Sequence, residues 1–175
     1  PLKDSGNIFH GNALRLDWEK VCPKQDEHGE LEVYVCGNPP FVHSKKRTDE
    51  QNADMERVLG HLQGFKMIDY VGCWFEKCRL YVNKANASGA FVSTNSLCQG
   101  EQVSRLWPNL LTTLEIIFAV QAFPWSNSAK DKAGVHVVVI GFKDKEQGHI
   151  EKRLYKNDGK RIQIQKVKNI NPYLV

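Results

Sequence analysis

Apolar residues in this chain gather into short runs that alternate with amphipathic segments and polar loops. Runs of about four to eight β-branched and aromatic residues, closed by turn-forming residues, are typical of buried strands. Such strands are predicted at 7–14, 31–37, 90–95, 114–123 and 135–142. Apolar positions at helical spacing predict helices at 48–64, 67–82 and 101–111. Strands separated by helices indicate an α/β sheet, and the last two strands, joined by a loop alone, should pair antiparallel.

The pattern changes after Phe142. Two short strands, 150–155 and 161–165, flank Asn157-Asp158-Gly159, which is a strong hairpin signal. The tail from 166 to 175 is expected to be an exit linker.

The strand predicted at 31–37 is followed by Asn38-Pro39-Pro40-Phe41. Two prolines in a row stop the sheet ladder because neither can donate a backbone hydrogen bond. Pro39 also drives Asn38 into an extended conformation. An amide side chain, carbonyls without competing donors and an aromatic ring are therefore expected at the carboxyl end of the strand.

This arrangement suits the exocyclic amine of a nucleobase, which is a poor nucleophile because its lone pair is delocalised into the ring. The Asn38 side-chain oxygen and the Pro39 carbonyl would hold both N–H bonds and stabilise positive charge as the nitrogen attacks. Losing one such contact typically costs about 10²–10³ in rate. Phe41 would stack on the base, worth roughly 1–3 kcal/mol. The alternative is a tight turn with a capping Asn and a core Phe.

Composition narrows the class of protein. With 41% hydrophobic and 25% charged residues, the 175 residues are typical of one soluble globular domain. The net charge of +4 permits a polyanionic partner without requiring one. No apolar run of about 18 residues and no signal peptide are found, so we expect a cytoplasmic protein without a membrane span. Five cysteines without a C-x-x-C pair are expected to be free thiols, and six histidines without ligand spacing predict no metal site.

Taken together, these stretches resemble the γ-type N6-adenine DNA methyltransferases, most closely those of single-chain Type IIG and Type IIL restriction–modification enzymes. The residues that carry the resemblance follow the family's order along nearly the whole chain: 11–14, 37–41, 72–77, 90–95, 125–127, 137–142 and 169–174. The Asn-Pro-Pro-Phe motif alone is shared with RNA and protein-glutamine methyltransferases, and the flanking stretches make the match more specific.

The resemblance implies a partial Rossmann-like sheet of an S-adenosylmethionine-dependent methyltransferase, with parallel strands, one antiparallel strand and a C-terminal β-hairpin. Residues 1–142 would be the C-terminal part of the catalytic domain. Residues 143–175 would be the hairpin and a linker toward a target-recognition domain.

The resemblance also implies a role for individual residues. Asn12 and Ala13 would lie at the adenine of the cofactor, and the Trp74 ring would pack against it. Without the family, Asn12 reads equally well as a turn residue and Trp74 as a core residue of an amphipathic helix. Phe123 or Trp125 would shape the far side of the target-base pocket, and the loop length leaves that choice open.

At the other end of the base pocket, the resemblance makes Asn38, Pro39 and Phe41 the catalytic group. Asn38 and Pro39 would accept hydrogen bonds from the N6 amine of a flipped adenine, and Phe41 would stack on it.

One departure from the family is large. The Gly-rich loop that cradles the cofactor's amino-acid end is missing, because no G-x-G occurs in this chain, and the acidic residue that binds the ribose is missing too. We therefore interpret the chain as a fragment of a larger enzyme, as its start at Pro1 also indicates. We expect the isolated chain to be inactive and to bind S-adenosylmethionine weakly or not at all. The uncovered edge of the strand at Val33 is expected to recruit another chain, including a second copy.

Three functions compete. The first is a DNA adenine methyltransferase of restriction–modification, which would bind double-stranded DNA and flip its target base. The basic residues at 45–47, 152–153 and 160–161 could contact the DNA phosphates. The alternative is that these residues are solvated surface charge. The same Asn-Pro-Pro site would also serve methylation of RNA or of a protein glutamine. A non-catalytic fragment is the third reading.

Overall fold

The computed structural model describes residues 8–83, 85–125, 135–148, 150–157 and 161–175. Its helices and strands run in the order α1 (Trp18–Val21), β1 (Gln25–Asp26), β2 (Gly29–Glu30), β3 (Val33–Gly37), α2 (Asp49–Leu59), α3 (Gly72–Val82), β4 (Ala87–Thr94), α4 (Gly100–Leu110), β5 (Leu114–Pro124), β6 (His136–Asp144), β7 (Lys152–Asn157) and β8 (Ile162–Val167). Short 3-10 helices lie at Ser44–Lys46, Phe65–Met67 and Asn95–Cys98.

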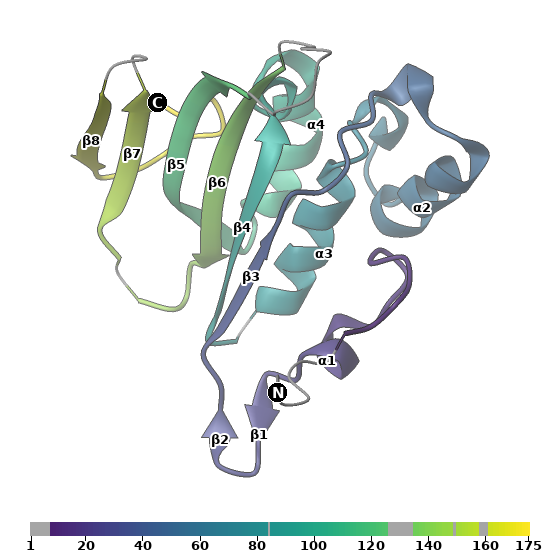
Figure 1. Ribbon diagram of the computed structural model, residues 1–175, viewed down its shortest axis with the longest axis horizontal. Coiled ribbons are helices and arrows are strands. Elements are labelled where there is room, and N and C mark those ends of the chain that lie inside the picture. Colours follow the sequence, from purple (N-terminus) through teal and green to yellow (C-terminus); the bar gives the residue numbers. More distant parts are fainter. Residues whose placement is uncertain (1–7, 84, 126–134, 149, 158–160) are drawn as a thin grey trace, which may run out of the picture.

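Within these ranges the main sheet has six strands in the order β3-β4-β6-β5-β7-β8 (Figure 1). β3 pairs parallel with β4, and β5 pairs parallel with β7. β6 runs antiparallel to both β4 and β5, and β8 runs antiparallel to β7. The mixed α/β sheet with one antiparallel strand and a C-terminal hairpin is confirmed, and the hairpin extends the same sheet.

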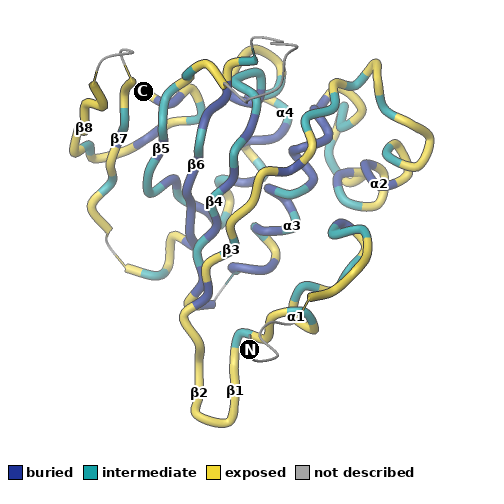
Figure 2. Tube along the Cα trace, in the orientation of Figure 1, coloured by how far each residue is buried: buried dark blue, intermediate teal, exposed yellow. Residues whose placement is uncertain are grey.

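Helices α3 and α4 lie against one face of this sheet (Figure 1). Phe75 of α3 is fully buried, and its ring centroid lies 5.3 Å from that of Phe91 in β4, 5.5 Å from Phe142 in β6 and 6.1 Å from Trp107 in α4. Gly89 permits this approach, because a Cβ there would lie 2.5 Å from Cys78 Sγ on α3. Figure 2 shows buried positions concentrated where these helices meet the sheet, whereas β1, β2 and most of β8 are exposed.

Helix boundaries follow local sequence signals closely. Thr48 caps α2 by accepting a hydrogen bond from Gln51 N, and the Gln51 side chain accepts one from Thr48 N, so the capping box is present. α4 forms despite Pro108 inside it, as predicted. α2 and α3 are both shorter than predicted. The segment between them turns at Gly64, whose φ of 72° is left-handed, and this φ favours glycine.

The structure differs from the prediction in two segments. Residues 8–14 form no strand; Ile8 is 92% exposed, and a turn at 13–15 brings only Leu14 into the core. Residues 25–30, where no strand is predicted, form the small β1–β2 hairpin. The tail that is expected to be an exit linker packs on the fold, because Ile170 and Leu174 are buried and Gln121 Nε2 donates to the Leu174 carbonyl, and its role as a linker stays a prediction.

β3 is an edge strand rather than a buried one. Among the described strands it pairs with β4 alone, and Tyr34 is 67% exposed. The uncovered edge that the sequence predicts is present, while self-association through it stays a prediction.

Candidate methyltransferase site

The predicted site lies at one end of the strands. The carboxyl ends of β3, β4 and β5 all lie at this end of the sheet, and the antiparallel β6 begins there (Figure 1). Ligands of open α/β sheets bind at the carboxyl ends of parallel strands. The topology therefore gathers the residues that follow these strands around one opening.

Asn38 and Pro39 follow β3 at this end of the sheet. The Asn38 side-chain oxygen and the Pro39 carbonyl can each accept hydrogen bonds. Asn38 is exposed, and its side chain forms no hydrogen bond with any residue in the described ranges. Pro39 is buried, and its carbonyl receives no backbone donor from those ranges either. Among the described residues, neither acceptor therefore has a competing hydrogen-bond partner.

The segment that carries these acceptors is anchored from behind. Phe41 is partly buried and packs against the hydrophobic core. The carbonyl of the next residue, Val42, accepts a hydrogen bond of 3.0 Å from Tyr70 N, just before α3. The segment that follows β3 is therefore fixed to the core and to the start of α3.

The residues predicted to meet the cofactor lie in a tight turn after His10. Asn12 Oδ1 accepts from Leu14 N at 3.0 Å, and the Asn12 carbonyl accepts from Arg15 N and Leu16 N. The Ala13 carbonyl accepts from Trp18 Nε1 at 2.8 Å. Asn12 is thus a turn residue, and its side chain is held in one orientation.

Asp54 on α2 fixes this turn to the rest of the fold. It is 1% exposed and accepts hydrogen bonds from Asn12 Nδ2 at 2.8 Å, Tyr70 OH at 2.8 Å and Arg15 Nε at 2.7 Å. The ring centroids of Tyr70 and Trp74 lie 5.2 Å apart in an edge-to-face contact. Asn12 and Trp74, which the sequence assigns to the same ligand, are therefore joined through two further residues.

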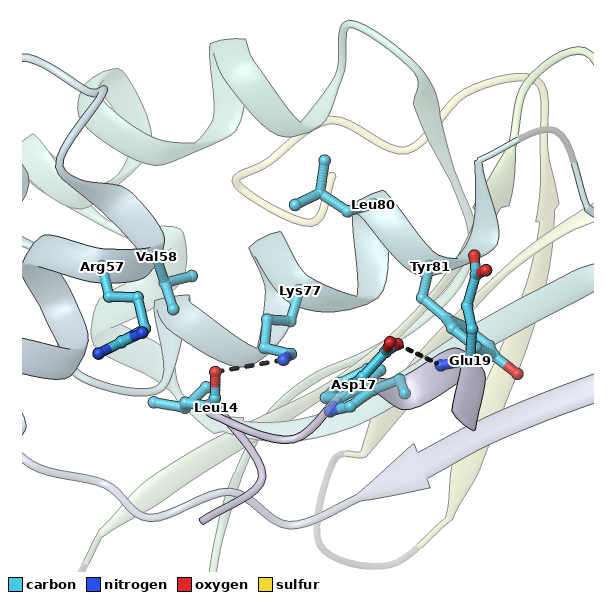
Figure 3. A pocket seen from close by; sticks show the side chains of 9 residues that line it. Leu14, Asp17, Glu19, Arg57, Val58, Lys77, Leu80 and Tyr81 are labelled. Carbon is cyan, nitrogen blue, oxygen red and sulfur yellow. Dashed lines mark hydrogen bonds between the residues drawn. The ribbon is translucent and has the colours of Figure 1, made fainter. Parts of the chain in front are cut away.

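Lys77 fastens the other end of the turn to α3. Its Nζ donates to the Leu14 carbonyl at 3.2 Å and to the Leu16 carbonyl, as Figure 3 shows for Leu14. It also lies 5.5 Å from the centre of the Trp18 ring. Burial lowers the pKa of the Lys77 ammonium, while the charge of Asp17 acts against this. Lys77 and Arg57 both face a groove of about 390 Å³ between α2, α3 and the turn.

The aromatic residues predicted for the far side of the base pocket lie at the end of β5, with Phe123 inside the strand and Trp125 directly after it. The ring centroids of Phe123 and Trp125 are 6.4 Å apart, and Trp125 is 39% exposed. β4 and β6 separate β5 from β3, so Phe123 and Asn38 leave the sheet about three strand spacings, or about 14 Å, apart. Ser126 and Asn127, which belong to the same predicted motif, lie outside the described residues.

Several basic residues considered for phosphate contact have internal roles. Arg47 donates to the carbonyls of Ile68 and Lys66 at 2.6 Å each. Lys152 forms an ion pair of 2.9 Å with Glu115, and Arg153 one of 3.1 Å with Glu151. Lys45 and Lys46 are exposed, and Lys160 lies outside the described residues.

The pKa of the Asp54 carboxyl predicts how the free energy of unfolding depends on pH. Burial raises the pKa of this carboxyl, but hydrogen bonds from Arg15, Tyr70 and Asn12 outweigh it and leave the pKa below its ordinary value. A lowered pKa stabilises the fold above the unfolded-state value of about 3.9, and this contribution is lost as the pH falls through the folded-state pKa. We expect Asp54→Asn to cost about 1.5–3 kcal/mol at pH 7 and much less near pH 3, measured by urea unfolding. The exposed Glu56→Gln on the same helix is the control, and an equal cost at both pH values would contradict this assignment.

Asp54 and Tyr70 were missed by sequence reasoning. The available signal was the position of Asp54 in α2. Among the acidic residues of this helix, Asp54 alone is buried, as are Met55 and Leu59. Such a residue is rarely buried without partners, but the sequence does not name those partners.

Two absences concern only the ranges given above. No helix there is long and apolar enough to cross a membrane. No three His, Cys, Asp or Glu side chains there gather closely enough to hold a metal ion.

The chain is similar to known proteins along its whole length. The family model of the MmeI DNA-methyltransferase domain matches residues 1–156. DNA methyltransferase A of Bacillus subtilis (strain 168) is 43% identical over 175 residues, which are 99% of this chain and 19% of that protein. A structure of the Type IIL restriction–modification enzyme MmeI in complex with DNA superposes with a TM-score of 0.86 at 42% identity, covering 100% of this chain and 23% of that one. This chain spans about a fifth of the length of each relative, and it belongs to the MmeI DNA-methyltransferase domain family of Type IIL restriction–modification enzymes.

Proposed function

We propose that this chain carries the target-base site of an adenine-specific DNA methyltransferase of restriction–modification, which uses S-adenosylmethionine to methylate N6. The observation that carries the proposal is a pair of acceptors, Asn38 Oδ1 and the Pro39 carbonyl, that no described residue engages, on a segment anchored to the core by Phe41 and Val42. Family membership supports DNA as the substrate class.

In the proposed reaction, Asn38 and Pro39 each accept one N–H of the target amine. This turns the nitrogen lone pair out of the ring plane, so that it can form the new N–C bond. The same two oxygens stabilise the positive charge that develops on the nitrogen before it loses a proton to solvent. When bound, S-adenosylmethionine would supply the electrophilic methyl group, and the electrons of the broken S–C bond would stay on its sulfur. Phe41 stacks on the flipped base and offsets part of the few kcal/mol that flipping costs.

The cofactor's adenine would lie between the turn at Asn12 and Ala13 and the Trp74 ring. The structure supports this fit because the turn and α3 are linked at two points, through Asp54–Tyr70 and through Lys77. The chain has no G-x-G sequence to cradle the cofactor's amino-acid end. We therefore expect the 175 residues alone to bind the cofactor weakly, and activity should be measured on the complete protein.

The proposal is tested by incubating the complete native protein with methyl-labelled S-adenosylmethionine and plasmid DNA, then digesting the DNA to nucleosides. The label is expected in N6-methyldeoxyadenosine. Parallel reactions with RNA and with a glutamine-containing release-factor peptide separate the competing substrates. Label in 5-methyl- or N4-methyldeoxycytidine, or in RNA or peptide alone, would contradict the proposal.

A further inference from the structure

Asp54 is a buried carboxylate that accepts hydrogen bonds from three side chains. Two donors, Asn12 Nδ2 and Tyr70 OH, share Oδ2, while Arg15 Nε bonds Oδ1. Arg15 in turn pairs with Glu50 one helical turn earlier, at 3.0 Å. A buried charge of this kind stays favourable only while its donors keep their geometry.

Two donors to Asp54 come from the two elements that are proposed to hold the cofactor's adenine. Asn12 belongs to the turn on one side. Tyr70 lies just before α3 and makes the edge-to-face contact with Trp74, one turn further along the helix on the other side. A single carboxylate oxygen thus links the turn to the tyrosine that contacts the indole.

The hydroxyl of Tyr70 is committed to this role. Burial and the neighbouring Asp54 carboxylate raise the pKa of Tyr70 well above its ordinary value, so the hydroxyl keeps its proton and remains a donor throughout the physiological pH range. The Tyr70 backbone N–H holds the Val42 carbonyl of the target-base segment. One residue therefore contacts both halves of the proposed site.

We infer that Asp54 and Tyr70 are positioning residues that set the affinity for the adenosyl part of the cofactor by holding the Asn12 turn and Trp74 at a fixed separation. This inference rests on the proposed function. If the spacing relaxes, the adenine loses contact with one wall, so affinity falls while the target-base clamp is kept.

The test compares Asp54→Asn, Tyr70→Phe and the double variant in the complete native protein, with the exposed Glu56→Gln as matched control. S-adenosylhomocysteine binding is measured by calorimetry, and kcat and KM are measured with DNA and cofactor varied separately. We expect about tenfold weaker binding for Asp54→Asn, a smaller loss for Tyr70→Phe, and kcat at saturating cofactor within about twofold. The double variant should be no weaker than Asp54→Asn, because both changes act through one carboxylate.

A merely structural role would lower the folded fraction and kcat without changing the dissociation constant of the folded protein. Tyr70→Phe keeps the ring and its contact with Trp74, so it separates the hydroxyl from packing. Wild-type affinity in both single variants would overturn the inference while leaving the proposed function intact. If the unaltered protein binds no S-adenosylhomocysteine, the proposed function fails, and the inference falls with it.

Discussion

Replacing Asn38 with alanine is expected to lower kcat for methyl transfer by about 10²–10³, which is the usual effect of removing one preorganised partner of a developing charge. The side chain is exposed and makes no hydrogen bond with the described part of the chain, so its loss should leave the free energy of unfolding within about 0.5 kcal/mol of wild type. Single-turnover methylation and urea unfolding of the same preparation measure both effects.

The matched control for this change is Asn86→Ala. Asn86 is an exposed asparagine just before β4, at the opposite end of the parallel strands from Asn38. It should change neither rate nor stability. A kcat for Asn38→Ala within about threefold of wild type would mean that the amide does not touch the reacting amine.

The second large effect concerns the core that supports the site. Phe75 is fully buried between α3, α4, β4 and β6, and α3 carries Trp74 and Lys77. We expect Phe75→Ala to lower the free energy of unfolding by about 3–5 kcal/mol, because it removes transfer energy and leaves a cavity. That is a large part of the about 5–15 kcal/mol by which typical domains are stable. Urea unfolding measures the loss.

Leu80→Ala on the same helix is the control, since Leu80 is 57% exposed and should cost little. A milder change, Phe75→Leu, should keep the protein folded and cost less than the alanine variant. Equal stability of Phe75→Ala and Leu80→Ala would contradict the packing described for α3.

Local signals explain which parts of the fold were predictable. The capping box at Thr48 and Gln51 is a contact between neighbours in the chain, and it marks the start of α2 correctly. The loop connection between the strands predicted at 114–123 and 135–142 likewise predicts the antiparallel pairing of β5 with β6. The apolar run at 7–14 misleads, because β-forming residues make a strand only where a neighbouring strand offers hydrogen bonds, and Asn12 is bonded to Asp54 instead.

The candidate site divides in the same way. Asn38, Pro39 and Phe41 lie within four residues of the chain, so the sequence could group them, and their catalytic role stays a prediction. Asp54 lies 42 positions from Asn12 and 16 from Tyr70. No spacing rule reaches across those distances, and only the fold shows that these residues share one carboxylate.

The most direct test of this site is a double-mutant cycle, in which one protein side chain and one group of the substrate are removed separately and together. After the methylated adenine has been located in DNA, duplexes carrying adenine or purine at that position are titrated with the wild-type complete protein and with Asn38→Ala. Purine lacks the exocyclic amine, so the account predicts that Asn38→Ala weakens binding of the adenine duplex by about tenfold and leaves the purine duplex unchanged. Equal losses on both duplexes would show that Asn38 does not hold the amine, and the central claim would be wrong.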